Sequence, residues 1–546
     1  MNRFIRAASL LGLLGSLLSV SAQAAPEVQI PAGKLRGEQI GELQVYRGIP
    51  YAQPPVKTLR WQPPVPVAAW EGVREATEFG PACHQPPSRP GSIYAPAEAK
   101  KMSEDCLSLN VWAPADVKDA PVFVWIHGGS LVAGSGSETL YDGAALAARG
   151  LVVVTINYRL GVLGYLAHPQ LSEESPDGIS GNYGLLDQIE ALHWVQRSIA
   201  AFGGDPDNVT VAGESAGALS VMYLLTSPKA RGLFHRAVVQ SGYLVSTPML
   251  KDTRHGTLSM EEQGLALSRN IEVRGLVRLR AMDPQELVVK SAMAGFLPMG
   301  TVDGQLIPAQ PTDIFERGEQ APVPLLAGFN EGEVRSLRFL LPPPPADAAS
   351  YEAALRERYG DLADAMLQHY PAEPMGESML ATTRDALYGW TAERLVRAQT
   401  AIGQTAFLYF FNHSYPSADA AGLHAFHASE IPFVMGTVEG TPPLWPKIPD
   451  SAVERSLAAA MQGYWSAFAR SGVPSASGQP AWPAYGEKRA YMAFNAAPEP
   501  GTDLLPGRFE LIDEVICRRR AQGDQPWHWN VGVVSPPLPP KGAQCP

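Results

Sequence analysis

Residues 208–217 (NVTVAGESAG) decide the fold, together with the residues that follow them. Residues 208–212 form a short run with β-branched residues and are predicted to be a buried strand, whereas residues 218–225 favour a helix. The turn between them, residues 213–217, fits the pattern G-x-S-x-G, which places a serine side chain above the edge of a sheet. Ser215 is therefore a candidate nucleophile. An ordinary turn with a helix-capping serine is the alternative.

The segments before this turn alternate between strand and helix patterns. Residues 121–126 (PVFVWI) and 151–157 (LVVVTIN) are apolar, β-branched runs that are typical of buried strands. Residues 142–149 (DGAALAAR), which start with an Asp suited to an N-cap, and residues 185–200 have helix patterns. Alternating strands and helices predict an α/β fold with a doubly wound, mostly parallel sheet.

Two polar stretches, residues 251–294 and 342–400, are predicted to be helical. We expect them to be insertions over the C-terminal edge of the sheet, where α/β proteins bind ligands. The sequence shows no internal repeat and no clear second boundary, so residues 25–546 are predicted to form a single domain.

The N-terminus has the pattern of a secretory signal. Two arginines precede an apolar run at residues 7–20, and small residues follow at Ala22 and Ala24. This pattern predicts a signal peptide over residues 1–24 and a mature protein that is periplasmic or extracellular. An uncleaved N-terminal anchor is the alternative, although the run is short for a membrane span.

Composition excludes several classes of partner. The chain has 546 residues, is 45% hydrophobic and carries a formal net charge of −11. An acidic balance argues against binding to nucleic acid or to an anionic membrane surface. No later stretch approaches the ~18 apolar residues of a membrane span, so stable membrane insertion is not expected. The sequence does not indicate an oligomeric state.

The cysteines are consistent with export. They are Cys83, Cys106, Cys517 and Cys545. An even number of cysteines in an exported protein favours disulfides over metal ligands, and no C-x-x-C spacing indicates zinc or redox chemistry. Pairing of near neighbours would join Cys83 to Cys106 and Cys517 to Cys545. Free buried thiols are the alternative.

A glycine-rich segment directly follows the strand predicted over residues 121–126. It reads His127-Gly128-Gly129-Ser130 and would let backbone N–H groups approach a substrate closely, as an oxyanion hole requires. The N–H of Ala216, next to the candidate nucleophile, would supply another donor. Taken alone, the glycine pair also fits a tight turn with positive φ.

These motifs occur in a chain that resembles a known family. Residues 104–110 (EDCLSLN) and 201–217 (AFGGDPDNVTVAGESAG) are similar to the two signatures of the type B carboxylesterase family, which includes carboxylesterases, cholinesterases and bacterial nitrobenzyl esterases. Residues 46–52 (YRGIPYA) and 181–188 (GNYGLLDQ) match in the same order. The resemblance extends over nearly all of the mature chain, from about residue 45 to about residue 482.

The resemblance implies an α/β-hydrolase fold, a Ser–Glu–His triad and a disulfide between Cys83 and Cys106. Its histidine would be His427, in residues 427–433 (HASEIPF), which resemble the family's H-x-x-E/D-x-x-F segment. The oxyanion donors implied by the resemblance are the N–H groups of Gly129, Ser130 and Ala216. Ser130 replaces the usual Gly or Ala, but a backbone donor survives that change.

Two of these assignments have rivals nearby. The implied acid is Glu333, in residues 328–333 (GFNEGE), where the family usually has Asp-Glu-Gly and this chain has Gly-Glu-Val. Glu331 is the other candidate acid, and a solvent-facing loop carboxylate is its alternative interpretation. His424 lies close to His427 but is interpreted as a solvated loop histidine.

The implied activity is hydrolysis of carboxylic esters through an acyl-enzyme, without a metal or cofactor. The sequence has no dinucleotide fingerprint and no H-E-x-x-H motif. Choline esters are not expected, because the segment between Cys83 and Cys106 has no tryptophan for a cation–π contact and only Tyr94 as an aromatic. Trp445 and Trp465 are interpreted as core residues.

Two alternative functions stay open at this point. One is an exported hydrolase that attacks polyesters or plant-wall esters, such as feruloyl esters, with the same triad. The other is a non-catalytic binding protein, because a fold alone never establishes activity. Occupied serine, histidine and acid positions disfavour that second alternative.

Overall fold

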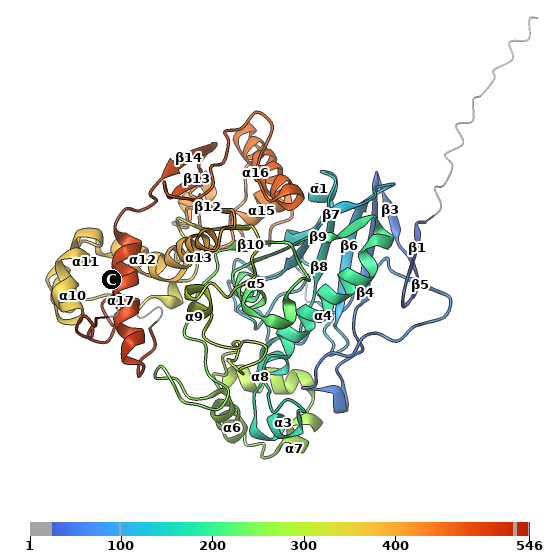
Figure 1. The fold of residues 1–546 in the computed structure, drawn as a ribbon, viewed down its shortest axis with the longest axis horizontal. Helices are drawn as coiled ribbons and strands as arrows, with labels where there is room; N and C mark the ends of the chain where they lie inside the picture. The colour runs from blue at the N-terminus through green and yellow to red at the C-terminus, as the bar shows by residue number, and fades with distance from the viewer. Residues whose placement is uncertain (1–24, 98–99, 528–531, 544, 546) are drawn as a thin grey trace, which may run out of the picture.

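The computed structural model describes residues 25–97, 100–527, 532–543 and 545 (Figure 1). The predicted signal peptide, residues 1–24, lies outside the described residues. Among the helices of the described ranges, none combines the length and the apolar character needed to cross a membrane.

The described residues form one large sheet of 11 strands, which runs through the molecule in Figure 1. Adjacent strands are parallel from β8 to β13 and antiparallel towards both edges. In spatial order the strands are β14 (Pro498–Thr502), β13 (Ala490–Phe494), β12 (Ala406–Phe411), β11 (Leu325–Asn330), β10 (Arg236–Gln240), β9 (Gly204–Glu214), β7 (Ala120–Ile126), β8 (Val152–Ile156), β6 (Ser108–Pro114), β4 (Leu43–Pro50) and β3 (Glu38–Ile40). A separate three-stranded sheet near the N-terminus contains β1 (Glu27–Ile30), β2 (Gly33–Arg36) and β5 (Val73–Glu75).

Helices connect and flank these strands. They are α1 (Ala144–Ala147), α2 (Gly161–Tyr165), α3 (Pro169–Glu174), α4 (Tyr183–Ser198), α5 (Ala216–Thr226), α9 (Pro311–Glu316), α14 (Pro416–Ala420), α15 (Ile431–Met435), α16 (Ala452–Ser471) and α17 (Arg508–Gln522). The two predicted helical insertions contain α6 (Met260–Asn270), α7 (Leu276–Ala281) and α8 (Pro284–Met293), and then α10 (Ala348–Tyr359), α11 (Ala363–His369), α12 (Met375–Arg384) and α13 (Trp390–Ala401). A π-helical segment, η7 (Asp385–Gly389), joins α12 to α13.

The central strands are buried on both faces, which is why they are continuously apolar in sequence. Side chains of β7 alternate between two core clusters. Val124 packs in one cluster with Leu192 of α4 and Leu219 of α5, whereas Trp125 packs in the other with Met461 of α16. Helices therefore cover both faces of a mostly parallel sheet, and the predicted doubly wound α/β fold is confirmed. Trp445 and Trp465 are buried in the second cluster, as expected.

Two predicted boundaries were wrong in detail. The helix expected over residues 142–149 is shorter, because the Asp142 side chain accepts a hydrogen bond from the Ala144 N–H at 2.8 Å and the helix begins only there. The Gly-Gly-Asp-Pro segment at residues 203–206 was expected to separate a helix from a strand, but β9 already starts at Gly204. A register shift between β7 and β9 accommodates these first residues.

Disulfides join Cys83 to Cys106 and Cys517 to Cys545. The first closes a loop between β5 and β6. The second ties α17 to the C-terminal segment, close to α10 and α11 in Figure 1. The described residues of neither loop form a strand of the main sheet, so the disulfides hold long segments outside the sheet in place.

Candidate active site

The predicted site residues come from loops that follow parallel strands. The segment starting with Gly128 follows β7, Ser215 follows β9, Glu333 follows β11, and His427 lies in the longer loop after β12. Because the carboxyl ends of parallel strands meet at one edge of a sheet, these loops converge although their residues are far apart in sequence.

Ser215 occupies a strained turn between β9 and α5. Its backbone has φ 55° and ψ −119°, a combination that non-glycine residues rarely adopt. The flanking glycines make the turn possible, because a side chain at either position would clash with the backbone. A Cβ at Gly217 would lie 2.0 Å from the Ile126 carbonyl oxygen. A Cβ at Gly213 would lie 2.5 Å from the Gly217 carbonyl carbon. The Ser215 N–H donates to the Gln240 carbonyl at 2.9 Å, which holds the turn against β10.

His427 and Glu333 are in direct contact. Their Nδ1 and Oε2 atoms lie 2.5 Å apart, and Glu333 is fully buried. The other carboxylate oxygen of Glu333 accepts the Asn330 N–H at 2.8 Å. The Gly332 N–H donates to the Ala425 carbonyl at 2.7 Å, so the two loops that bear these side chains are hydrogen-bonded to each other.

The two rival residues lie elsewhere. The Glu331 side chain is about one third exposed and lies 3.5 Å from the Arg384 guanidinium. His424 is exposed, and its Nδ1 lies 2.7 Å from the Asp419 carboxylate. The structure thus brings Glu333, rather than Glu331, against His427.

The glycine-rich segment after β7 adopts an unusual backbone. Gly129, Ser130 and Leu131 have φ values of 101°, 58° and 58°. A Cβ at Gly129 would lie 2.1 Å from the Ala133 carbonyl oxygen, so only glycine fits there. Within the described part of the chain, the N–H groups of Gly129 and Ser130 have no intramolecular acceptor.

Ala216 is the third predicted oxyanion donor. It is the first residue of α5, and an N–H in the first turn of a helix has no intrahelical acceptor. The positive end of the helix dipole also favours negative charge at this position. The arrangement leaves backbone donors on the segments that flank Ser215, as stabilisation of an oxyanion requires.

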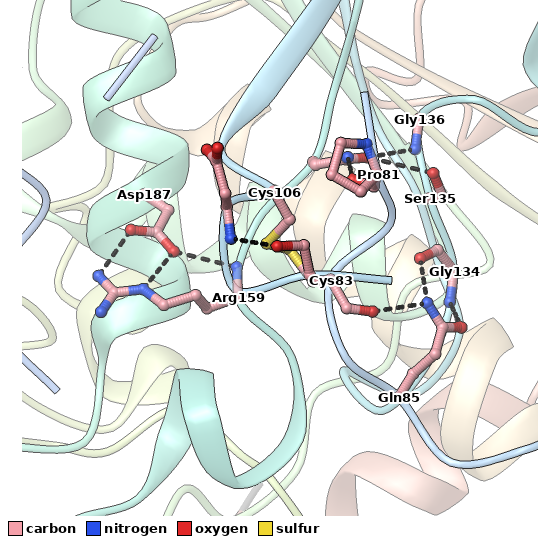
Figure 2. The surroundings of a disulfide bond; sticks show 12 residues. Pro81, Cys83, Gln85, Cys106, Gly134, Ser135, Gly136, Arg159 and Asp187 are labelled. Carbon is pink, nitrogen blue, oxygen red and sulfur yellow. Dashed lines mark hydrogen bonds and ion pairs between the residues drawn. A yellow bond between two sulfur atoms is a disulfide. The ribbon is translucent and has the colours of Figure 1, made fainter. Parts of the chain in front are cut away.

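The loop closed by Cys83 and Cys106 is anchored to the segment after β7. Figure 2 shows Gln85 beside Gly134: its amide donates to the Gly134 carbonyl at 3.0 Å and accepts the Gly134 N–H at 2.9 Å. A buried ion pair between Arg159 and Asp187, at 2.7 Å, lies on the other side of the disulfide in the same view. The two Gln85 contacts therefore fix this part of the loop against the segment after β7.

The same loop also contacts the His427 segment through Tyr94. The Tyr94 hydroxyl lies 3.0 Å from the His427 carbonyl oxygen and 2.7 Å from the Ser336 hydroxyl. Its ring packs edge-on against Trp445, which in turn packs against Phe426. The sequence identifies Tyr94 only as the aromatic residue of this loop, because no local pattern shows which distant carbonyl its hydroxyl reaches.

Replacing Tyr94 by phenylalanine should lower kcat roughly 2- to 10-fold with little change in KM, the effect of one hydrogen bond that orients His427. Steady-state kinetics on a soluble ester would measure it. Ser336→Ala is the matched control, because it removes the other partner of Tyr94 and leaves the contact with His427 in place. An equal loss in both variants would contradict a specific role of the Tyr94–His427 contact.

Carboxylates surround His427. Glu214 Oε1 lies 3.1 Å from His427 Nε2, and the buried Glu430 accepts hydrogen bonds from Asn330 and Gln240. Burial raises the pKa of Glu214 to about 8, although His427 opposes this shift. Both glutamates belong to the quoted motifs, Glu214 as the first variable residue of G-x-S-x-G, but no local pattern indicates their position beside His427.

The pKa of His427 reflects a balance between burial and charge. Burial alone would lower it, but the carboxylates of Glu214 and Glu333 outweigh burial and raise the pKa to about 9. Since a histidine must be neutral to accept a proton, these carboxylates move the required deprotonation towards higher pH.

In the described ranges, no group of three or more His, Cys, Asp or Glu side chains is arranged to hold a metal ion.

Glu214→Gln should therefore shift the acid limb of the kcat/KM–pH profile to lower pH by roughly one unit, because it removes one carboxylate that stabilises protonated His427. Profiles of the wild type and the variant with an uncharged ester between about pH 5 and pH 10 would test this. A limb that stays in place, or moves to higher pH, would show that Glu214 does not control the titration.

The chain is similar to known esterases over most of its length. The model of the carboxylesterase family matches residues 24–507. The chain is 38% identical over 502 residues to a fumonisin B1 esterase of Sphingopyxis macrogoltabida, an alignment that covers 87% of each protein. It is 36% identical over 469 residues to the para-nitrobenzyl esterase of Bacillus subtilis, with 84% of this chain and 92% of that protein covered.

Solved structures show the same similarity. A structure of a PNB esterase superposes with a TM-score of 0.78 at 33% sequence identity, covering 89% of this chain and 99% of that one. A carboxylesterase of Geobacillus stearothermophilus superposes with a TM-score of 0.73 at 33% identity and the same coverage. The similarity therefore extends over 89% of this chain.

Proposed function

Since this chain belongs to the carboxylesterase family, we propose that its ester hydrolysis proceeds through Ser215, with His427 as general base and Glu333 as the acid that orients it. The chain has the α/β-hydrolase fold of its structural neighbours and is a carboxylic ester hydrolase. The contact between His427 Nδ1 and Glu333 Oε2 carries the proposal, because it leaves Nε2 as the basic nitrogen of the imidazole.

Acylation follows from these positions. His427 Nε2 takes the proton from Ser215 as the serine oxygen bonds to the carbonyl carbon of the ester. The negative charge that forms on the carbonyl oxygen is stabilised by the N–H groups of Gly129, Ser130 and Ala216. When the tetrahedral intermediate collapses, the bond to the alcohol oxygen breaks and protonated His427 donates its proton to the leaving alkoxide.

Deacylation repeats these steps with water. His427 takes a proton from a water molecule as the water oxygen bonds to the acyl carbon. When the second tetrahedral intermediate collapses, the bond between the acyl carbon and the Ser215 oxygen breaks, protonated His427 returns its proton to that oxygen, and the acid is released. Glu333 keeps Nδ1 protonated and stabilises the imidazolium in both halves of the reaction. Each backbone oxyanion donor contributes on the order of 10²–10³ in rate in related chemistry.

The proposal includes export before activity. The predicted signal peptide supports it, and both disulfides are of the kind that persists in oxidising compartments. We propose small soluble esters as the substrates. The names of the relatives, a fumonisin B1 esterase and a para-nitrobenzyl esterase, support small esters. Polyesters or plant-wall esters, whose ester bonds the same triad would attack, are the second candidate class.

An ester panel tests the proposal. The purified chain would be incubated with 4-nitrophenyl acetate and butyrate, with a feruloyl ester and with a polyester film, in parallel with Ser215→Ala. We expect rapid release of nitrophenol by the wild type and none above background by the variant. Faster release of ferulate or of polyester monomers than of nitrophenol would favour the second substrate class. No turnover of any ester by folded protein would contradict the proposed function.

A further inference from the structure

A π-helical segment places a tyrosine against the catalytic histidine. Between α12 and α13 the chain forms η7, and π-helical turns of this kind often occur at functional sites. The ring of Tyr388, within η7, lies 5.3 Å from the imidazole ring of His427. Tyr388 plays no part in the proton transfers described above.

A second tyrosine lies beside the first. Tyr243 follows β10 at the edge of the sheet that also holds Ser215, and its ring packs edge-on against Tyr388 at 6.2 Å. The Tyr243 side chain is half-buried, whereas Tyr388 is only 2% exposed. The two rings come from segments more than a hundred residues apart and meet next to His427.

Both hydroxyls lack a partner. Within the described ranges neither the Tyr388 hydroxyl nor the Tyr243 hydroxyl makes a hydrogen bond to the protein, and neither oxygen is fully closed off from solvent. Because both hydroxyls are open to solvent and have no protein partner, they are free to bond to a group that arrives with the substrate.

The surrounding charges restrict that partner. Burial, and then the carboxylates of Glu333 and Glu214, raise the pKa of Tyr388, so its hydroxyl stays protonated and can donate. Burial and Glu214 also raise the pKa of Tyr243. A hydroxyl that stays protonated donates to an oxygen acceptor, and the uncharged ether, carbonyl or hydroxyl oxygen of an ester can accept such a bond.

We propose that Tyr388 and Tyr243 form a polar subsite that hydrogen-bonds to an uncharged oxygen of the ester substrate, an ether, carbonyl or hydroxyl oxygen close to the reacting carbonyl. The inference rests on the proposed function, because an ester attacked by Ser215 must also lie within reach of His427 and hence of Tyr388. It specifies the substrate class: esters with a neutral polar group near the ester bond, in preference to purely hydrocarbon ones.

Matched ester pairs test this subsite. The acyl pair is 4-nitrophenyl 3-methoxypropanoate and 4-nitrophenyl pentanoate, and the alcohol pair is 2-methoxyethyl acetate and butyl acetate. Within each pair an oxygen replaces one methylene group, so size is nearly constant. The measured quantity is the ratio of kcat/KM for the ether ester to that for the hydrocarbon ester, in the wild type and in Tyr388→Phe and Tyr243→Phe.

In Tyr388→Phe we expect this ratio to fall roughly 3- to 10-fold for at least one ester pair, because one hydrogen bond to the ether oxygen is lost. In Tyr243→Phe the ratio should fall for the same ester pair. Intrinsic reactivity cancels, because the same esters are compared across variants. Tyr491→Phe, in β13 next to the edge strand β14, is the matched control, and its ratios should equal those of the wild type.

The outcomes separate this inference from the proposed function. The proposed subsite would be overturned if the ratios for both ester pairs stayed within two-fold of the wild type in Tyr388→Phe and in Tyr243→Phe. That result would leave the proposed ester hydrolysis intact. An equal fall in Tyr491→Phe would also overturn it. Absence of hydrolysis of all four esters by folded wild-type protein would instead contradict the proposed function itself.

Discussion

Replacing Ser215 by alanine should lower kcat/KM for any ester substrate by roughly 10⁴-fold or more, as loss of the nucleophile does in other serine hydrolases. Without the serine oxygen no acyl-enzyme can form, and the remaining rate comes only from the oxyanion donors and from binding. The fold should persist, because the Ser215 N–H that donates to Gln240 is a backbone group that alanine keeps.

Ser227→Ala is the matched control for this substitution. Ser227 is also buried and lies at the opposite end of the same helix, α5. We expect its kcat/KM to stay within about two-fold of the wild type, as is usual for residues that do not touch the substrate. If Ser215→Ala kept more than roughly a hundredth of the wild-type activity, a different nucleophile would have to be sought.

Glu333→Gln should lower kcat on the order of 10³–10⁴-fold, whereas Glu331→Gln should lower it only a few-fold. Glutamine keeps the size of Glu333 but loses the charge that stabilises the imidazolium, and its amide does not enforce the correct tautomer of His427. Glu331 is partly exposed and its nearest charge is Arg384, so its carboxylate does not act on the histidine directly.

The two glutamine variants form a matched pair, because the same chemical change is made two residues apart on one loop. Kinetics on a soluble ester, with thermal unfolding to verify that both variants fold, would measure the difference. The reverse order of effects, with Glu331→Gln inactive and Glu333→Gln active, would show that the acid has been assigned to the wrong carboxylate.

Local motifs made the turn at Ser215 and the sheet predictable from sequence. The turn at Ser215, its flanking glycines and the strand before it are contiguous, so one short segment contains the geometry. The apolar runs of β7 and β8 were recognisable for a similar reason, because burial on both faces removes polar residues from them. Edge strand β14 (PEPGT) was not recognisable, since proline is tolerated only at such edges and weakens the strand pattern.

Contacts between distant loops were not predictable in the same way. What separates Glu333 from Glu331 is the hydrogen bond from Gly332 to Ala425, which aligns the acid loop with the loop of His427. The approach of Tyr388 to His427 depends on a π-helical turn, and no residue pattern of α12 or α13 indicates where the helix widens. The role of such residues is set by tertiary packing rather than by local sequence.

Covalent labelling tests the central claim most directly, namely that Ser215 is an activated nucleophile. The intact mass of the wild type and of Ser215→Ala would be measured after treatment with a fluorophosphonate, which reacts with activated serines. We predict a single adduct on the wild type, quantitative and accompanied by loss of ester hydrolysis, and no adduct on Ser215→Ala. An unlabelled wild type that is folded, or an adduct that persists in Ser215→Ala, would contradict the assignment of Ser215.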